Sequence, residues 1–263
     1  LEGKLSHVNL ISLSSVEIVG SVFLLKKYNL SLANTLCALC TNGLGLDQDL
    51  QFQYSSYPQD SNINKLIRLF HHLYGSPNRD LLQFREGWGN DEVAFEVPGV
   101  EIPCPSIYRW PHPNYHSTDD SIEAFDCNHF ESSVSLLESI ILSIDSNHYI
   151  TSVNISSLAC FSSPDIGLYV EPDFISGMAV NSFSLEGLSV HSNSYELNYL
   201  NSNRSLINLF MNKLFPYLIH NPHPSVIDIA DEFLLPPFFV LSYLQKLESL
   251  GMITLSTSIS SLT

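Results

Sequence analysis

Acidic and imidazole side chains gather between residues 88 and 120, in the stretch WGNDEVAFEVPGVEIPCPSIYRWPHPNYHSTDD. Asp91 and Glu92 open this stretch, and two glycines before them allow a tight backbone approach. A carboxylate at the end of a strand is suited to be a metal ligand or a catalytic acid. The alternative for Asp91 is an ordinary turn residue, because Gly-Asn-Asp is typical turn chemistry.

His116 stands near the end of the same stretch, followed by Ser117, Thr118 and Asp119, which can all cap a helix. A histidine just before a helix, with a carboxylate close enough to fix its tautomer, is the usual arrangement of a zinc ligand. Asp119 or Asp120 is the candidate for that second carboxylate. The alternative is an exposed loop histidine beside a capping cluster.

Glu17 is the third candidate. It follows residues 7–14, HVNLISLS, whose alternation of apolar and polar residues predicts a strand. Open α/β sheets keep their sites at the carboxyl ends of strands, so Glu17 is a candidate metal ligand or general base. The alternative is an ordinary exposed glutamate.

Cysteines give a weaker signal. Cys37 and Cys40 have the two-residue gap of a metal-binding or redox pair, but they lie in an apolar run without a second pair downstream. We therefore interpret them as core residues. The total of five cysteines is odd, which favours free thiols in a reducing compartment and a cytoplasmic location.

The overall charge excludes some classes of function. The formal net charge of the 263 residues is −16 and no basic run is present, which argues against binding to nucleic acid or to anionic membrane surfaces. No apolar run is long enough to predict a transmembrane helix. The first residues lack the pattern of a signal peptide.

The order of the expected elements predicts an α/β fold, in which helices alternate with strands. Amphipathic spacing and end signals predict helices at 61–75 and 128–146, and a short apolar run suggests a helix at 20–29. Strands are expected at four segments besides the helices: 7–14, 35–43, 50–57 and 80–87.

Three divisions of the chain are predicted. Residues 1–148 form an α/β domain, 149–201 an irregular Ser- and Asn-rich connector, and 202–263 a small domain. In the last part, helices are expected at 206–219, where Pro216 interrupts or ends the helix, at 225–233 and at 235–251, followed by a strand. This order is the outline of a winged helix.

The three weak signals occur in an order that resembles a known family. VEIVGS at 16–21, NDEVAFEVPGVEIPC at 90–104 and NYHSTDD at 114–120 resemble motifs of the co-catalytic zinc aminopeptidase superfamily. The likeness is to its bacterial aminopeptidase-like branch, whose members end in a winged helix. The resemblance implies a three-layer, phosphorylase/hydrolase-like α/β domain and a zinc cofactor.

Carried over to this sequence, the resemblance implies that Asp91 and His116 are zinc ligands. It implies that Glu17 is a ligand or the base that activates the metal-bound water. Asp120, with Glu92 and Asp119, would surround the ligands. The implied substrate is a small peptide or an amide.

The sequence also departs from the family's pattern. No His-rich segment with the family's first zinc ligands precedes Glu17, Val93 stands where the branch has Arg, and Val16 stands where it has Pro. A catalytic zinc needs three protein ligands. A missing N-terminal portion, a partner chain or a homo-oligomer is therefore also considered.

Two functions follow from these observations. The first is a zinc-dependent aminopeptidase-like hydrolase, and the second is a catalytically inactive module of the same fold that binds a partner. A DNA-binding regulator is not favoured, because the expected recognition helix contains one Lys and no Arg.

Overall fold

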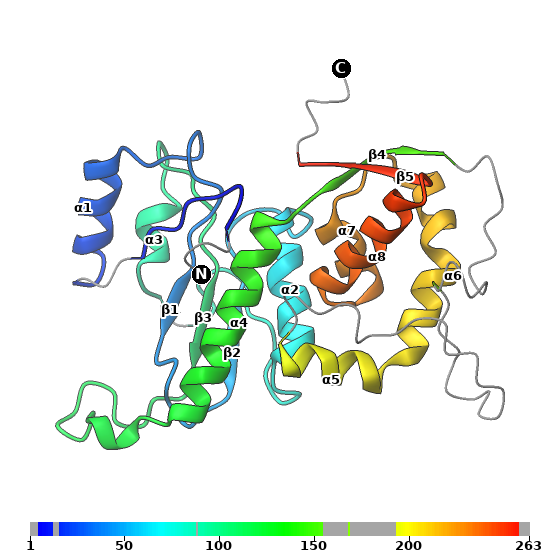
Figure 1. Cartoon of the computed structure of the whole chain (residues 1–263). Coiled ribbons are helices and arrows are strands. Elements are labelled where there is room, and N and C mark those ends of the chain that lie inside the picture. The colour runs from blue at the N-terminus through cyan, green and yellow to red at the C-terminus, as the bar shows by residue number, and fades with distance from the viewer. Residues whose placement is uncertain (1–4, 13–15, 88, 155–167, 169–192, 258–263) are drawn as a thin grey trace. The chain divides into compact units, whose positions relative to one another are not determined.

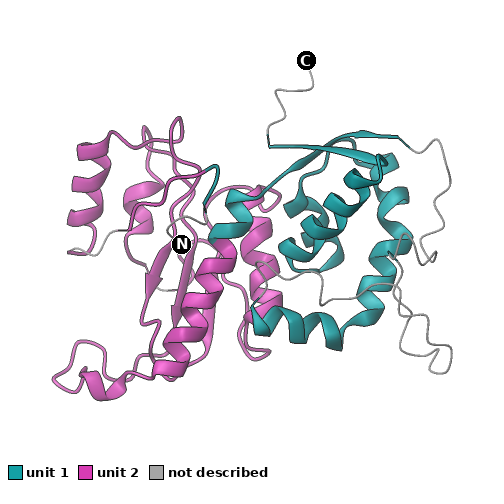
Figure 2. Ribbon diagram, viewed as in Figure 1, with its two compact units in different colours: residues 1–7, 141–263 teal, residues 8–140 magenta. Residues whose placement is uncertain are grey.

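The structure is a computed structural model that describes residues 5–12, 16–87, 89–154, 168 and 193–257 (Figure 1). It divides into two compact units, one formed by residues 8–140 and the other by residues 1–7 and 141–263 (Figure 2). The domain boundaries predicted at 148/149 and 201/202 stay predictions, and most of the expected connector lies outside the described residues. Among the described residues, no helix is both long and apolar enough to cross a membrane.

The unit of residues 8–140 is built around a three-stranded sheet with the order β1-β3-β2. Strand β1 (Cys40–Asn42) runs parallel to β3 (Ser106–Arg109), and β2 (Leu50–Gln53) runs antiparallel to it. The helices of this unit are α1 (Val19–Tyr28), α2 (Asn62–Tyr74), the one-turn α3 (Glu92–Phe95) and the first part of α4 (Cys127–Asp145), with a 3₁₀ turn η1 (Ile122–Ala124) before α4. The mixed α/β class is confirmed.

Helix α2 shows how the hydrophobic pattern builds this core. The apolar residues of one stripe recur at helical spacing and are buried, and β2, which packs against α2, contributes the buried Phe52. Burying such a stripe against a sheet is the main favourable term in forming the layer. The buried residues of the stripe are Ile63, Leu66, Ile67, Phe70 and Leu73.

The other unit contains α5 (Ser194–Ser202), α6 (Arg204–His220), α7 (Val226–Phe233) and α8 (Pro237–Ser249). Strands β4 (Tyr149–Val153) and β5 (Ile253–Ser256) form an antiparallel pair. The predicted helices 206–219, 225–233 and 235–251 are confirmed, but α6 continues through Pro216 to His220 instead of ending there, since Leu214 and Leu218 on either side are packed in the core. The assignment of this unit to a winged helix stays a prediction.

Several predicted strands are wrong. Residues 7–12 form no strand, and 13–15 lie outside the described residues. In 80–87 only Leu82 makes an isolated bridge, to Gln53. In 35–43 the strand is limited to Cys40–Asn42, and Thr41 and Asn42 are exposed rather than buried. These segments are short, and a short apolar run does not by itself decide between strand and loop.

The buried guanidinium of Arg109 joins β3 to the start of α4. Its Nε donates to the Leu44 carbonyl and to Ser133 Oγ, both at 3.1 Å, and its Nη1 donates to the Gln48 carbonyl at 2.6 Å. Its Nη2 donates to the His129 carbonyl at 3.2 Å and to Ser132 Oγ at 2.9 Å. A buried charge is tolerated only when its donors are paired, and here five bonds satisfy it.

Replacing this guanidinium tests its contribution. We expect Arg109→Met to lower the free energy of unfolding by about 2–3 kcal/mol, because a buried polar group left without its partner costs about 1–3 kcal/mol. The control is Lys26→Met, since Lys26 is an exposed cation on α1 and exposed charges contribute about 1 kcal/mol or less. Urea denaturation followed by circular dichroism measures both. An equal loss in the two variants would contradict the role given to Arg109.

Candidate functional site

Asp91 connects two segments that are far apart in sequence. It lies directly before α3, and its Oδ1 accepts a hydrogen bond of 2.5 Å from the backbone N–H of Ile18. The prediction that Asp91 ends a strand is wrong, because residues 80–87 form a loop with one bridge and Asp91 follows a turn. The carboxylate therefore holds the start of α1 next to the start of α3.

The position of Ile18 explains why a carboxylate suits this contact. Ile18 is the residue before α1, where backbone N–H groups have no partner inside the helix and the helix dipole is positive. The first turn of α1 contains no acidic residue of its own. Asp91 supplies that negative charge from 73 positions away in the sequence.

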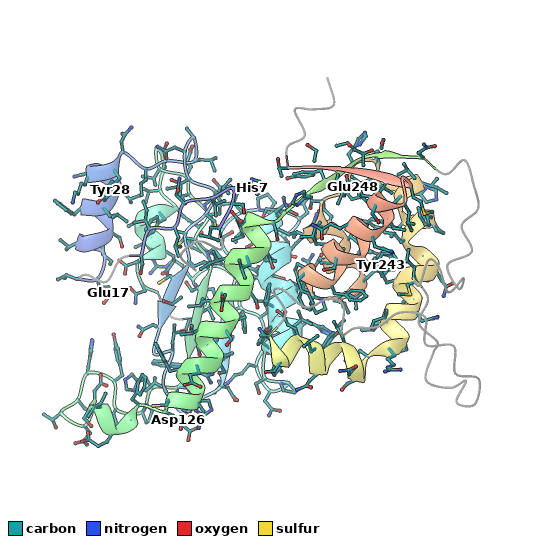
Figure 3. All side chains as sticks on the ribbon, viewed as in Figure 1. His7, Glu17, Tyr28, Asp126, Tyr243 and Glu248 are labelled. Atoms are coloured by element: carbon teal, nitrogen blue, oxygen red, sulfur yellow. The ribbon has the colours of Figure 1, made fainter. Side chains whose placement is uncertain are left out.

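Glu17 is exposed in the turn that leads into α1, and Figure 3 shows it at the opposite end of this helix from Tyr28. The prediction that it ends a strand is wrong, since the described residues before it form none. Its negative charge nevertheless acts on the loop that carries His116. Burial, Glu17 and Asp120 together raise the pKa of the Tyr115 hydroxyl. Glu17 is thus within electrostatic reach of Tyr115.

The loop of residues 110–121 is organised by ring contacts around Tyr115. The Tyr115 ring stacks on the His116 ring with a centroid separation of 3.8 Å and an interplanar angle of 19°. Trp110 and His112 meet Tyr115 edge-on, at 6.3 and 5.8 Å between centroids. His116 itself is exposed and has a φ of 57°, which few non-glycine residues adopt.

The helix predicted directly after His116 is absent. Ser117 instead closes a turn, because its N–H and its hydroxyl both donate to the Asn114 carbonyl, and the 3₁₀ turn η1 begins only at Ile122. Asp119 is exposed, and its N–H donates to Ser117 Oγ at 3.2 Å. Asp119 thus takes part in the turn rather than in capping a helix.

Asp120 has a partner that the sequence did not suggest. Its Oδ1 lies 3.1 Å from His112 Nε2, so the carboxylate contacts His112 rather than His116. The other ring nitrogen of His112 is buried and has no hydrogen-bond partner among the described residues. The eight-residue separation of His112 and Asp120 was visible in the sequence, but only the turn between them brings the two together.

Glu92 is fully buried and is tied to its own turn. Both of its carboxylate oxygens accept from the Asn90 N–H, at 2.9 and 2.8 Å. Burial raises the pKa of Glu92, and the nearby Asp91 adds to this, whereas backbone N–H groups and Arg85 act in the opposite direction. This geometry assigns Glu92 to holding the turn before α3.

Cys40 lies close to Asp91 and Glu92. Cys37, Cys40, Cys104 and Cys127 are free, and Cys160 lies outside the described residues. Burial raises the pKa of Cys37 and of Cys40 to about 11, and Glu92 contributes to the shift of Cys40. Thiols with a raised pKa are poor nucleophiles at neutral pH, which agrees with a packing role.

The candidate ligands do not complete a zinc site by themselves. Within the described ranges, no group of three or more His, Cys, Asp or Glu side chains is arranged to hold a metal ion. A catalytic zinc needs three protein ligands, and one oxygen of Asp91 is already engaged by Ile18. The assignment of Asp91, His116 and Glu17 as zinc ligands therefore stays a prediction.

A family comparison matches residues 11–147, which contain all the candidate residues. The model that matches is described as a domain of unknown function, DUF4910. This chain belongs to that family. The family's description assigns no zinc site and no activity, and no curated protein matches the chain.

A solved structure extends the comparison beyond the DUF4910 region. It is described as a "putative peptidase" from Clostridium acetobutylicum and aligns with 91% of this chain at a TM-score of 0.59 and 14% identity. At this identity the likeness shows a shared fold. The DUF4910 chain spans about half of that protein, since the alignment covers 46% of the other chain.

The hydrogen bond between the Asp91 carboxylate and the Ile18 N–H can be tested by mutation. We expect Asp91→Ala to lower the free energy of unfolding by about 1 kcal/mol, as for the loss of a helix cap, and to speed amide hydrogen exchange at Ile18. Asp91→Asn should keep most of the protection, because its amide oxygen still accepts. The exposed Asp119→Ala is the control. Unchanged exchange at Ile18 in Asp91→Ala would contradict the contact.

Proposed function

We propose that this chain provides part or all of a peptidase-like hydrolase that acts on a peptide or amide bond. The observation that carries the proposal is the hydrogen bond that brings two of the motif segments together within the shared fold. Asp91 binds the backbone next to Glu17, and Glu17 lies within electrostatic reach of Tyr115, the neighbour of His116. These are the three segments that the sequence motifs singled out.

In this proposal Glu17 is the general base. Its carboxylate is exposed to solvent, so a substrate and a water molecule can reach it. A base in this position takes a proton from the attacking water and returns it to the leaving amine. Asp91 is a positioning residue, because its hydrogen bond to the Ile18 N–H fixes the backbone next to Glu17.

We also propose zinc as the cofactor of this hydrolase. Asp91, His116 and Glu17 are its proposed ligands, with Asp119, Asp120 and Glu92 nearby in sequence. Because the described residues do not complete a zinc site, the steps given to Glu17 and Asp91 rest on these side chains alone. A bound zinc would polarise the scissile carbonyl.

The proposed substrate is a small peptide or amide, and the proposed location is the cytoplasm, in agreement with the free cysteines. The acidic net charge of −16 supports a protein without a nucleic-acid or membrane partner. A second candidate function is an inactive binding module of the same fold. It is favoured by the incomplete ligand set among the described residues and by Val93 in place of the family's Arg.

A substrate panel tests the first function. Purified protein is assayed with aminoacyl-methylcoumarylamides, and we expect Glu17→Gln to lower kcat/KM by about 100-fold or more, the usual contribution of a general base. Glu131→Gln, an exposed glutamate on α4, is the matched control and should leave kcat/KM unchanged.

Two results would contradict this proposal. Equal kcat/KM for wild type and Glu17→Gln would remove Glu17 from the reaction. No turnover of any substrate by a folded wild-type protein, together with a zinc content near zero by mass spectrometry, would favour the inactive module. A bound zinc that is lost in His116→Ala would support His116 as a ligand.

A further inference from the structure

The turn η1 and the start of α4 expose four large apolar side chains. The exposed fractions are 77% for Ile122, 43% for Phe125, 41% for Phe130 and 44% for Val134. The Phe125 and Phe130 rings contact each other, with their centroids 5.3 Å apart. Phe130 and Val134 are four residues apart on α4 and therefore lie on one face of this helix. We call these four residues the η1–α4 apolar surface.

The backbone around Phe125 holds this surface in a defined arrangement. Phe125 packs on Gly45 so closely that a Cβ at Gly45 would collide with its ring. Phe125 also forms an isolated bridge with Leu46, and the Asp126 N–H donates to the Gly45 carbonyl at 2.7 Å. The Phe125 N–H donates to the Ile122 carbonyl at 3.0 Å and so closes η1. The exposed side chains therefore stand on a backbone that is tied to a second loop.

Three carboxylates adjoin the η1–α4 apolar surface. Glu123 and Asp47 are exposed, and Asp126 is partly exposed at the start of α4, where Figure 3 labels it. The His129 Nδ1 lies 3.6 Å from Asp47 Oδ1 and 3.3 Å from Asp126 Oδ1, so these two acids are close together. Hydrogen bonding with Ser121 lowers the pKa of Glu123, and the His129 N–H lowers the pKa of Asp126. Both acids are therefore ionised at neutral pH.

We propose that the η1–α4 apolar surface and the carboxylates of Asp47, Glu123 and Asp126 form a docking surface for a basic, amphipathic helix of a partner protein. The partner's apolar residues cover the surface, and its Lys or Arg residues pair with the acids at the rim. Residues 110–140 contain no Lys or Arg, and the Arg109 guanidinium is bonded inside the fold, so neither supplies a cation to this rim. This proposal does not depend on the chain being a hydrolase.

The charge of the rim selects this occupant over two others. A second copy of the chain that docks by the same surface brings the same three carboxylates to the interface, where like charges repel. An anionic membrane surface is repelled for the same reason. A helix suits the apolar part, because the ridge from Phe130 to Val134 fits into the groove between the ridges of another helix.

A synthetic peptide of about 18 residues tests the proposal. It carries Leu and Lys at the spacing of an amphipathic helix, and a second peptide has Glu in place of Lys. Its affinity for the 263-residue protein is measured by isothermal titration calorimetry. We expect Ile122→Ser to weaken binding at least about fivefold. The matched control is Ile219→Ser, because Ile219 on α6 is also 77% exposed and should not matter.

The charged rim has its own matched pair of variants. The double variant Asp47→Asn with Glu123→Gln should weaken binding of the Leu-Lys peptide at least about tenfold. The control, Asp60→Asn with Glu232→Gln, removes the same charge from exposed positions elsewhere and should bind like wild type. This control separates pairing at the rim from general attraction to a chain with a net charge of −16. Circular dichroism confirms that each variant is folded.

Nuclear magnetic resonance locates the contact. The amide signals of Ile122, Glu123 and Val134 should shift when the Leu-Lys peptide is added, and that of Ile219 should not. Three results would overturn the proposal: no binding of this peptide, equal weakening by the surface variants and their controls, or equal binding of the Leu-Glu peptide. A dimer of the chain, or binding to phosphatidylserine vesicles, that Ile122→Ser abolishes would also overturn it, because the surface would then have a different occupant.

Discussion

The buried guanidinium of Arg109 is the constraint on which the candidate site depends. Arg109 is the last residue of β3, and the loop with Tyr115, His116 and Asp120 begins directly after it. Three of its partners, the His129 carbonyl and the Ser132 and Ser133 hydroxyls, lie in the first turns of α4, which follows the same loop after η1. One side chain therefore fixes both ends of the loop.

The buried positive charge of Arg109 is hydrogen-bonded by neutral acceptors. Burial lowers the pKa of Arg109, and Asp47, Asp49 and Asp126 oppose that shift from a distance. Among the described residues, carbonyls and hydroxyls accept the hydrogen bonds of the guanidinium, and no carboxylate contacts it directly. Such a network is rigid when complete and costly when broken. It lets an otherwise irregular loop hold a defined position against the sheet.

Much of the fold could be predicted from the sequence, because a long amphipathic pattern by itself indicates a helix and its buried face. Helix α2 and the buried stripe from Ile63 to Leu73 follow directly from spacing and end signals. Short segments could not be predicted in this way. Residues 80–87 resemble a strand in composition, yet only Leu82 pairs, because strand formation there depends on the edge of β2 rather than on the segment itself.

The candidate site shows the same limit. The motifs brought Glu17, Asp91 and the loop of His116 to attention, but not the contacts that join them. The bond from Ile18 to Asp91 spans 73 positions, and the pairing of His112 with Asp120 requires a turn that was predicted as a helix start. Glu92, predicted as a neighbour of a metal site, also accepts from the Asn90 N–H within its own turn, a contact that the sequence did not suggest. Contacts of this kind arise from tertiary packing, which local patterns do not encode.

The central claim is that the Glu17 carboxylate acts electrostatically on the Tyr115 hydroxyl in the folded chain. Titration of the Tyr115 hydroxyl by ¹³C nuclear magnetic resonance, assigned through Tyr115→Phe, measures this most directly. The account predicts a pKa above the ordinary tyrosine value of 10.0 that falls in Glu17→Gln, because a nearby negative charge has been removed, and that stays unchanged in Glu123→Gln. A Tyr115 pKa that does not respond to Glu17→Gln would contradict the account.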